Sequence, residues 1–419
     1  MTVLIAGGGI GGLALALSLN QVGVQALVFE SAAEPKALGV GINVLPHAVR
    51  ELIELGLESD LDAIGVRTST LAYFSKHGKP IWSEPRGMDA GYRWPQFSVH
   101  RGALTQLLWN NAAERLGASA LHAGHHLHSW READEGVEAT FVDKASGQIA
   151  GVFRGNILVG ADGIHSSLRA SRYPDEGVPK WNGNILWRGV TFAPPFLDGR
   201  TMIMAGYATL KFVAYPIAPR RADGLQMINW IAERNMPPDY KWRRERYDRQ
   251  ARLEEFLPWF ESWRFDWLDV PALIRAAEYV YEYPMVDRDP LDHWTFGRAT
   301  LLGDAAHPMY PIGSNGASQA ILDARVLARA VQTVGETSDA LSAYEAERRP
   351  ATAKIVATNR RNGPDHVMQV VEERAPGGFS DIEAVMPLAE REAIAADYKR
   401  VAGFDRDTLN ARPSIIGLS

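Results

Sequence analysis

A short apolar segment runs directly into a glycine-rich loop near the N-terminus, and this junction constrains the fold more than any other feature. Residues 3–6 resemble a buried strand, the letters GGGIGG a turn, and residues 13–22 a helix. Gly7, Gly9 and Gly12 fit the pattern G-x-G-x-x-G in the strand–turn–helix setting that this pattern requires. Such glycines allow a tight turn, the approach of a pyrophosphate and close packing of helix on strand. The pattern predicts a Rossmann-like dinucleotide site that also includes Ile10 and Gly11.

The segment after this helix supports the same prediction. Residues 26–29 form a second apolar segment, which ends in Glu30. A carboxylate at this position accepts hydrogen bonds from the ribose of a bound dinucleotide. The chain carries one such fingerprint, so we expect one dinucleotide in a dedicated fold. These residues alone leave open whether it is FAD or NAD.

A second glycine-rich loop, GDAAHPMYPIGSNGA, occupies residues 303–317 and leads directly into an apolar-patterned helix. A loop of this kind brings backbone N–H groups close to a flat or anionic ligand, because the first turn of a helix has unsatisfied donors and a partial positive charge. The loop follows a buried apolar segment, which is the same arrangement as at the N-terminus. We therefore expect both loops to contact one ligand.

The order of the segments predicts an α/β fold with a discontinuous first domain. Residues 1–178 and 286–350 alternate apolar strands and helices, and we assign them to a Rossmann-like FAD-binding domain. Residues 179–285 are richer in aromatic strands separated by turns, which favours an inserted antiparallel sheet that binds substrate. Residues 351–419 form a predicted C-terminal helical segment. Within the first domain, residues 46–57 and 101–116 have the pattern of amphipathic helices, and the turn KASGQ after the alternating segment 126–142 predicts a hairpin.

Composition excludes several classes of protein. The net charge of -6 argues against nucleic acid as the main partner. The absence of cysteine excludes disulfides, a thiolate nucleophile and cysteine-ligated zinc. No uninterrupted apolar run is long enough to span a membrane, so we expect a cytoplasmic protein with no membrane partner.

Two segments resemble binding motifs without fitting them. The histidines of LHAGHHLHSW have no acidic or cysteine partner at metal spacing, so we expect no metal site there. The segment KWRRERYDRQARLEEF, residues 241–256, mixes acidic with basic residues, which favours a solvated amphipathic helix.

Four motifs together carry a resemblance to a known family. They are GGGIGG with Glu30, HRGALTQLL at 100–108, GADGIHSSLR at 160–169, and GDAAHPMYPIGSNGASQA at 303–320. In this order the set resembles the single-component FAD-dependent aromatic hydroxylases, whose fold is of the para-hydroxybenzoate hydroxylase type. The resemblance covers essentially the whole chain. Stretches such as LGVGINVLPHAV and YPMVDRDPL are most similar to the 5-methylphenazine-1-carboxylate hydroxylases of pyocyanin synthesis, and salicylate and 3-hydroxybenzoate hydroxylases are more distant.

The resemblance implies non-covalently bound FAD and assigns residues to it. Asp304 would bind the ribityl chain, and Arg101 would contact the cofactor. Asp162 and Gly163 would form a turn that serves FAD and, transiently, NADH or NADPH. Simpler readings remain, with Asp162 as a helix cap and Asp304 as a solvated turn residue. Four residues of the second loop would place backbone groups at the pyrimidine edge of the flavin: Gly313, Asn315, Gly316 and Ala317.

The resemblance also implies a reaction. NAD(P)H reduces the flavin, oxygen adds to give a C4a-hydroperoxyflavin, and a planar aromatic or heteroaromatic acid of the phenazine-carboxylate type is hydroxylated. Pro311 would line the reacting face. In hydroxybenzoate-type relatives one strand carries a histidine base and, four residues later, a tyrosine, whereas this chain has Lys211 and Tyr215. We therefore expect Lys211 either to face an anionic substrate or to extend to solvent. Arg188 would hold a substrate carboxylate or form a salt bridge at the strand edge. Tyr207 and Tyr215 are further expected substrate contacts.

Other functions remain open on the sequence. The chain lacks the W-x-W-x-I-P stretch of flavin halogenases. A flavin-dependent reductase or oxidase, or a non-catalytic FAD-binding protein, would share the cofactor motifs. The expected partners are a small aromatic substrate and O2, and we expect a monomer or a homodimer.

Overall fold

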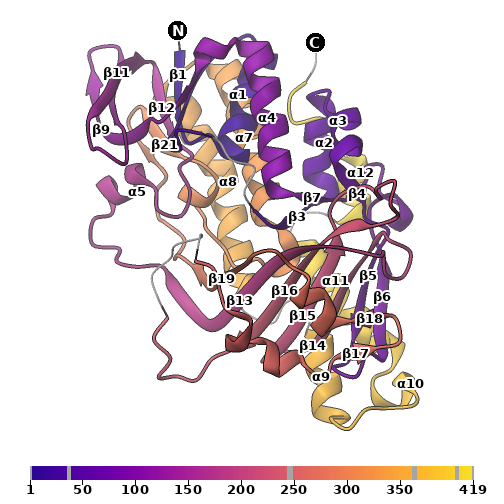
Figure 1. Cartoon of the computed structure of the whole chain (residues 1–419). Helices are drawn as coiled ribbons and strands as arrows, with labels where there is room; N and C mark the ends of the chain where they lie inside the picture. Colours follow the sequence, from indigo (N-terminus) through magenta and orange to yellow (C-terminus); the bar gives the residue numbers. More distant parts are fainter. Residues whose placement is uncertain (1, 35–38, 243–248, 361–365, 402–404, 418–419) are drawn as a thin grey trace.

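The computed structural model describes residues 2–34, 39–242, 249–360, 366–401 and 405–417, and it contains two large sheets (Figure 1). The first sheet has six strands in the order β20-β21-β12-β1-β2-β8. Its strands are parallel except β20, which pairs antiparallel with β21. They span β1 (Thr2–Ala6), β2 (Gln25–Glu30), β8 (Leu121–Ala123), β12 (Ile157–Gly160), β20 (Thr295–Phe296) and β21 (Ala299–Leu301).

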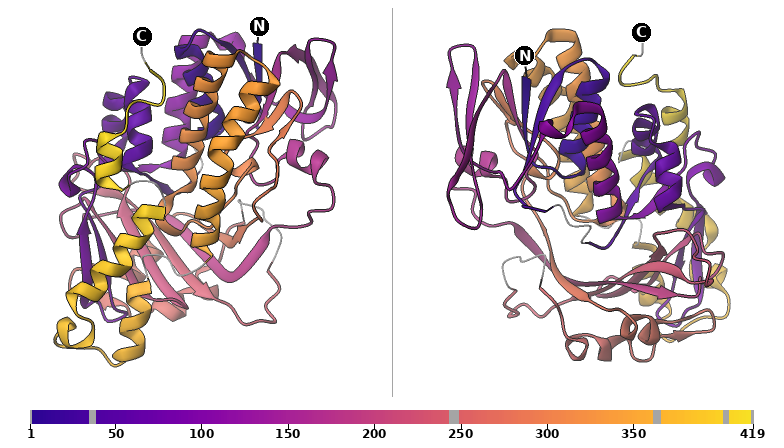
Figure 2. Two further views of the ribbon diagram at one scale, coloured as in Figure 1. Left: turned by 180° about the vertical axis from the view of Figure 1, so that it is seen from behind. Right: turned by 45° about the horizontal axis from the view of Figure 1, so that its top comes forward.

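The central strands of the first sheet, β1 and β12, are largely apolar because both faces of the sheet are covered. Val3, Leu4 and Ile5 of β1 have no exposed surface, as expected for a parallel sheet between two layers. The helices α1 (Ile10–Gln21), α4 (Arg101–Leu116) and α7 (Gly316–Val334) pack together on one side, and α8 (Ser338–Asn359) packs on α7 (Figure 2).

A small antiparallel sheet packs against the first sheet. It consists of β9 (His126–Ala133), β10 (Gly136–Val142) and β11 (Ile149–Gly155), and the ring of Phe141 stacks on Phe29 of β2 at 3.9 Å. This confirms the hairpin predicted at the turn KASGQ, because β10 and β11 pair antiparallel across it.

The second large sheet has seven strands in the order β19-β13-β16-β15-β14-β5-β6. All neighbouring strands are antiparallel except β14 and β5. Five strands come from the segment in which an antiparallel sheet was predicted, although β19 ends just beyond it at Asp287. The strands span β13 (Lys180–Ala193), β14 (Thr201–Tyr207), β15 (Leu210–Pro216), β16 (Gln226–Asn235), β19 (Val280–Asp287), β5 (Thr70–Phe74) and β6 (Pro80–Pro85).

Strands β5 and β6 belong to the segment that the sequence assigned to FAD binding, yet they extend the second sheet. A further three-stranded sheet of β3 (Gly41–Val44), β7 (Phe97–His100) and β4 (Gly65–Arg67) lies near the junction of the two large sheets (Figure 1). The chain therefore enters the second large sheet before β5 and leaves it after β6.

Helices deviate from the predicted ranges in two places. One helix was expected over 46–57, but the structure has α2 (Pro46–Glu54) and α3 (Glu58–Ile64), separated at Gly56, whose φ is 78°. The boundary placed at residue 350 falls inside α8, so this helix continues into the C-terminal segment. That segment contains α9 (His366–Arg374), α10 (Ile382–Val385), α11 (Leu388–Val401) and α12 (Arg406–Ala411).

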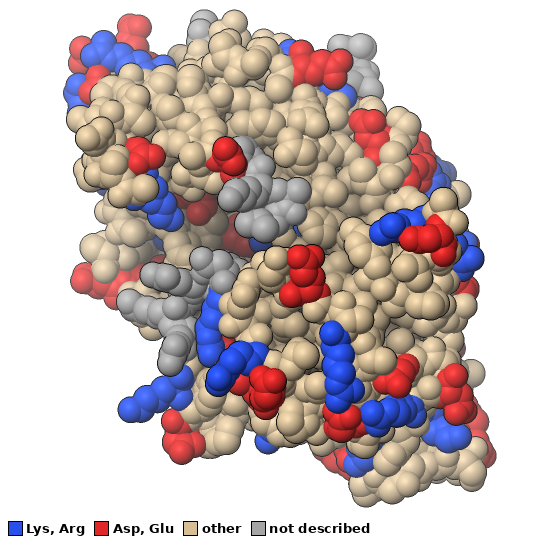
Figure 3. Space-filling view, in the orientation of Figure 1, with Lys and Arg blue, Asp and Glu red and all other residues tan. Residues whose placement is uncertain are grey.

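The segment 241–256 is only partly described. Residues 243–248 lie outside the described residues, and the described part contains one 3₁₀ turn, Leu253–Glu255, where an amphipathic α-helix was expected. On the face shown in Figure 3, acidic and basic side chains are interspersed. Among the described residues, no helix is both long and apolar enough to cross a membrane.

Candidate active site

The first glycine loop is held tightly against the end of strand β12. Gly7 has a φ of 121°, and a Cβ atom built on it would lie 2.2 Å from the carbonyl oxygen of Ala161. A Cβ on Gly12 would lie 2.0 Å from the carbonyl oxygen of Gly7. In contrast, a Cβ on Gly9 would meet no atom within 4 Å. Gly7 and Gly12 are therefore required by the fold itself, whereas Gly9 faces open space.

The start of helix α1 offers free backbone donors. Gly9 is its N-cap residue and provides no side-chain cap, so the first N–H groups of the helix remain available to an anion. Ile10 is half-buried and packs on the core. Gly11 faces α7, because a Cβ there would lie 2.8 Å from a methyl carbon of Leu302 and 3.2 Å from Ala320. The loop thus has the shape and the charge expected of a pyrophosphate site.

Gly9→Ala tests this site separately from the fold. We expect the variant to fold as apoprotein with an unchanged melting temperature, because the added methyl group meets no protein atom. FAD affinity should fall at least about tenfold, because the methyl group blocks the approach of the pyrophosphate. Fluorescence titration of the apoprotein with FAD measures this change. Gly7→Ala is the matched comparison and should lower the melting temperature of the apoprotein. FAD binding by Gly9→Ala as tight as in the wild type would contradict the assignment.

Glu30 lies at the end of β2 and is already engaged in the loop. Its Oε2 accepts a hydrogen bond from the N–H of Gly8 at 2.9 Å, and its Oε1 accepts one from the N–H of Ala32 at 2.8 Å. The Ser31 hydroxyl also donates to Oε1. An ionised carboxylate has about four acceptor positions, so capacity for a ribose hydroxyl remains. The carboxylate shapes the loop, and its ribose contact stays a prediction.

Asp162 and Gly163 form the turn after β12, next to Gly7. The Oδ2 atom of Asp162 accepts a hydrogen bond from the N–H of Ser167 at 2.7 Å, at the start of helix α5 (Ser167–Arg172). Asp162 therefore supports the start of α5, whose N-cap residue is Ser166. Its Oδ1 atom is buried and has no hydrogen-bond partner among the described residues. Burial raises the pKa of this carboxyl group, although hydrogen bonds from Ser166 and Ser167 oppose the shift. One oxygen thus remains for a ligand.

Asp304 follows strand β21 and faces a cavity. Its side chain is exposed to that cavity, yet the surrounding protein raises the pKa of its carboxyl group, and the charges of His307 and Arg101 oppose this shift. A Cβ built on Gly316 would lie 3.8 Å from its Oδ1 atom, so the carboxylate adjoins the start of α7. Arg101 is exposed at the start of α4.

A buried carboxylate that the sequence analysis missed holds the second glycine loop in place. Asp323 of α7 accepts hydrogen bonds from the N–H of Gly303 at 3.1 Å, from Nε2 of His307 at 2.5 Å and from Nε of Arg348 at 2.6 Å. Arg348 also donates to the side chain of Gln319 at 2.6 Å. Burial raises the pKa of Asp323, but the charges of His307 and Arg348 outweigh burial and leave the pKa below its ordinary value.

The second loop turns sharply before α7 begins at Gly316. Gly313 and Ser314 have φ values of 68° and 58°, and exposed Pro311 precedes them. Buried Asn315 is the N-cap residue, and its side chain accepts no hydrogen bond from the helix backbone. The loop residues Pro311, Gly313, Asn315, Gly316 and Ala317 all line the cavity that Asp304 faces. The start of α7 therefore points its free donors toward this cavity.

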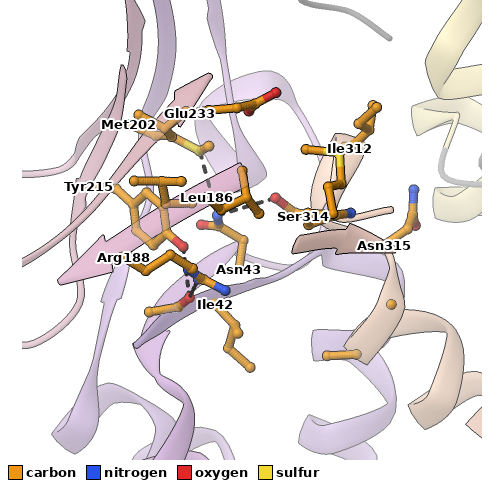
Figure 4. A pocket seen from close by; sticks show the side chains of 18 of the residues that line it. Ile42, Asn43, Leu186, Arg188, Met202, Tyr215, Glu233, Ile312, Ser314 and Asn315 are labelled. Carbon is orange, nitrogen blue, oxygen red and sulfur yellow. Dashed lines mark hydrogen bonds between the residues drawn. The ribbon is translucent and has the colours of Figure 1, made fainter. Parts of the chain in front are cut away.

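The cavity has a volume of about 240 Å³ and lies between this loop and one face of the second sheet (Figure 4). Arg188 of β13 and Tyr215 of β15 both donate to the carbonyl oxygen of Gly41, at 2.7 and 2.9 Å. The Nε atom of Arg188 is buried and has no acceptor among the described residues. Apolar side chains form much of the remaining wall: Ile42, Leu186, Met202, Met204, Val213, Ile231, Met285, Met309 and Ile312.

Lys211 lines the cavity as predicted, but its surroundings differ from the prediction. Its Nζ atom lies 3.3 Å from Oε2 of Glu233, and both side chains are largely buried. The ammonium group thus already has a carboxylate partner within the protein. Glu233 was not predicted to lie in the site, because nothing in the local pattern shows that it lies opposite Lys211 on the neighbouring strand.

Tyr207 lies away from the described cavity wall, so its assignment as a substrate contact is not supported. Side chains alternate between the two faces of a strand, and Met202 and Met204 of β14 occupy the cavity face. Tyr207 therefore points to the other face, where Lys76 lies 5.6 Å from its ring. Trp187 and Phe212 also belong to the core on that face. Of the two tyrosines expected at the substrate, Tyr215 lies among the described residues of the cavity wall.

The histidine-rich segment has structural contacts. His122 stacks on Phe29 at 4.9 Å, and His126 lies 3.2 Å from the Ser167 hydroxyl. Within the described ranges, no cluster of three or more histidine or acidic side chains is arranged to hold a metal ion.

The glycine loop, the Asp162 turn and the start of α7 together define a dinucleotide-binding protein. A family model described as the FAD binding domain matches residues 1–255 and 276–359, and the chain belongs to this family. The predicted fold class is thereby confirmed.

Comparison with individual proteins is more specific. The chain is 42% identical to the phenazine 1,6-dicarboxylic acid hydroxylase PhzS of Lysobacter antibioticus, over 95% of this chain and 96% of that protein. It is 28% identical to salicylate hydroxylase of Pseudomonas putida, over 97% and 94%. The structure of HpxO from Klebsiella pneumoniae with FAD and uric acid shares the fold, with a TM-score of 0.75, 22% identity and coverage of 98% and 96%. The predicted likeness to flavin-dependent aromatic-ring monooxygenases is confirmed.

Proposed function

We propose that this protein hydroxylates the ring of a planar aromatic or heteroaromatic acid of the phenazine-carboxylate type, with O2 and NADH or NADPH. The observation that carries this proposal is the cavity in which Arg188 and Tyr215 converge beside the start of α7. Its volume of about 240 Å³ is below the range of roughly 300–1,000 Å³ for drug-sized ligands, so it suits a small substrate. The likeness to the phenazine 1,6-dicarboxylic acid hydroxylase supports an acid built on a phenazine-type ring.

The residues of the site fit FAD. The pyrophosphate would lie at Gly9 and the start of α1, and the ribityl chain at Asp304. The flavin ring would lie against the start of α7, whose partial positive charge favours the reduced, anionic ring. When bound, this cofactor supplies the redox chemistry that activates O2. The chain has one dinucleotide fingerprint, so NAD(P)H would bind only transiently, near the turn of Asp162 and Gly163.

Arg188 and Tyr215 have complementary roles in this proposal. Burial lowers the pKa of Arg188, and the nearby Tyr215 and Tyr283 oppose the shift. A buried guanidinium with an unused donor is stabilised by an anionic ligand. Burial raises the pKa of Tyr215, so its phenol stays protonated and can donate a hydrogen bond. Tyr215 already donates its one proton to the carbonyl oxygen of Gly41, so Arg188 would hold the substrate carboxylate and Tyr215 would fix the Gly41 backbone beside it.

Pro311 and the apolar wall would exclude water from the reacting face. Met202, Met204 and Ile231 cover the floor of the cavity with apolar atoms. Exclusion of water protects reactive intermediates from side reactions. In this proposal Pro311 stiffens the loop beside the ring and takes no part in proton transfer.

The proposal extends to organisation and location. Residues 1–178 and 286–350 would bind FAD and 179–285 the substrate, with β5 and β6 added to the substrate side because they extend its sheet. Residues 351–419 would form the C-terminal helical part. We propose a cytoplasmic monomer or homodimer, as expected from the sequence.

Arg188→Met tests the carboxylate contact. A charge-assisted hydrogen bond in a closed pocket contributes roughly 1.5–3 kcal/mol, so we expect KM for aromatic acids to rise about tenfold or more. KM for the corresponding neutral amides should change little. Steady-state kinetics on paired acids and amides measure both effects. Arg234→Met is the control, because Arg234 lies over Trp259 outside the described cavity wall. Equal turnover of acids and amides by the wild type would refute the carboxylate contact.

Product analysis distinguishes the remaining alternatives. With ¹⁸O2 and an aromatic acid, we expect one labelled oxygen on the product ring by mass spectrometry. A reductase or oxidase would consume NAD(P)H and leave the ring unlabelled. A non-catalytic FAD-binding protein would show no substrate-stimulated NAD(P)H oxidation.

A further inference from the structure

The cavity has a second polar end, formed by Lys211 and Glu233. These residues lie directly opposite each other on β15 and β16, with Nζ and Oε2 3.3 Å apart. Asn184 of β13 donates to the other carboxylate oxygen, Oε1, at 2.8 Å. Both charged side chains line the cavity, and they are 9% and 7% exposed. The pair is therefore part of the cavity wall and is largely removed from water.

The sheet register separates this pair from Arg188. Arg188 lies opposite Ile231 of β16, and Ile231 lies opposite Val213 of β15. Val213 therefore lies opposite Arg188 two strands away, and Lys211 lies two residues further along that strand. With strands about 4.8 Å apart and a rise of about 3.3 Å per residue, the Cα atoms of Lys211 and Arg188 are roughly 12 Å apart. Figure 4 likewise shows Arg188 and Glu233 at opposite ends of the cavity.

The two ends differ in what they accept. The Arg188 end has an unused donor and suits a carboxylate. At the other end the ammonium group of Lys211 already has a carboxylate partner, so a second substrate carboxylate would meet Glu233. This second carboxylate would lose its hydrating water and would be repelled by the like charge of Glu233, so its binding is unfavourable. A hydroxyl, an amino group or a ring N–H can instead donate to a carboxylate oxygen.

We propose that the Lys211–Glu233 pair is a specificity determinant that admits aromatic monocarboxylates and rejects dicarboxylates whose second carboxylate lies at the end remote from Arg188. This inference rests on the proposed hydroxylation of aromatic acids. Glu233 causes this rejection, because it forms the ion pair with Lys211 and its own negative charge repels a second substrate carboxylate. Selectivity against a competing ligand through an unfavourable contact is a general device of binding sites.

The test compares phenazine-1-carboxylate with phenazine-1,6-dicarboxylate as substrates of the FAD-loaded protein. For the wild type we expect kcat/KM for the dicarboxylate to be at least tenfold lower than for the monocarboxylate. In Glu233→Gln the ratio should shift by at least tenfold toward the dicarboxylate, because Lys211 loses this carboxylate partner. The glutamine keeps an oxygen for the bond from Asn184. The change should appear mainly in KM.

Two further variants separate charge from packing. In the double variant Lys211→Met/Glu233→Gln the gain for the dicarboxylate should disappear, because it depends on the Lys211 cation. Glu282→Gln removes another largely buried carboxylate from the same sheet, outside the described cavity wall, and should leave the ratio unchanged.

The wild type alone can overturn the proposal. Equal kcat/KM for the two substrates in the wild type would do so even if Glu233→Gln failed to fold, and so would an unchanged ratio in a folded, FAD-loaded Glu233→Gln. Hydroxylation of neither acid would instead contradict the proposed function, so the two failures are distinguishable.

Discussion

Asp323→Asn is expected to lower the free energy of unfolding by about 3–5 kcal/mol, because removing one partner of a buried ion pair leaves the other charge uncompensated. Asp323 has no exposed surface, and Arg348 and His307 are almost completely buried beside it. The N–H of Gly303 also depends on this carboxylate. We therefore expect weaker FAD binding as well, since Gly303 immediately precedes Asp304.

Urea unfolding of the apoprotein measures this loss. Asp134→Asn is the control, because Asp134 is exposed in a turn and its replacement should change stability by less than about 0.5 kcal/mol. A loss below about 1 kcal/mol for Asp323→Asn would contradict the assigned network.

The loss of stability in Asp323→Asn should depend on pH. The pKa of Asp323 is lower in the folded protein than its ordinary value of about 4. A carboxyl group with a lowered folded pKa stabilises the fold above its unfolded pKa, and this contribution is lost as the pH falls through the folded pKa. The difference in stability between wild type and Asp323→Asn should therefore be largest near neutral pH and shrink below about pH 4. A constant difference between pH 7 and pH 3 would mean that the charge of Asp323 is not responsible.

Asp304→Ala is expected to weaken FAD binding by about 1–3 kcal/mol, which corresponds to roughly 5- to 150-fold in Kd. The carboxylate faces the cavity beside Gly316, and its loss would leave polar groups of the bound cofactor without a partner. Fluorescence titration of apoprotein with FAD measures the change. The stability of the apoprotein should change little, because the side chain is exposed.

Asp304→Asn helps to identify the interaction. Its amide oxygen keeps an acceptor, so we expect an FAD affinity between those of the wild type and Asp304→Ala. Retention of wild-type affinity by Asp304→Ala would show that Asp304 does not bind the ribityl chain.

The sequence by itself determined the features that depend on short-range geometry. The first strand, the glycine loop and the helix after it were predictable because the apolar pattern and the glycine spacing lie within one short stretch of the chain. A Cβ on Gly12 would collide with Gly7, five residues earlier. The hairpin at KASGQ and the helix Arg101–Leu116 also follow from local periodicity and turn residues. The cofactor class followed from these motifs and from the family resemblance.

Only the tertiary structure decided which residues meet across the site. Tyr207 and Tyr215 both lie in aromatic strands, yet strand alternation and packing place only Tyr215 among the described residues of the cavity wall. Glu233 lies opposite Lys211 through the register of two strands that are far apart in sequence. Asp323 meets His307 and Arg348 because α7 and α8 pack together behind the loop. The local sequence encodes turns and periodicity, but strand register and helix packing depend on the chain as a whole.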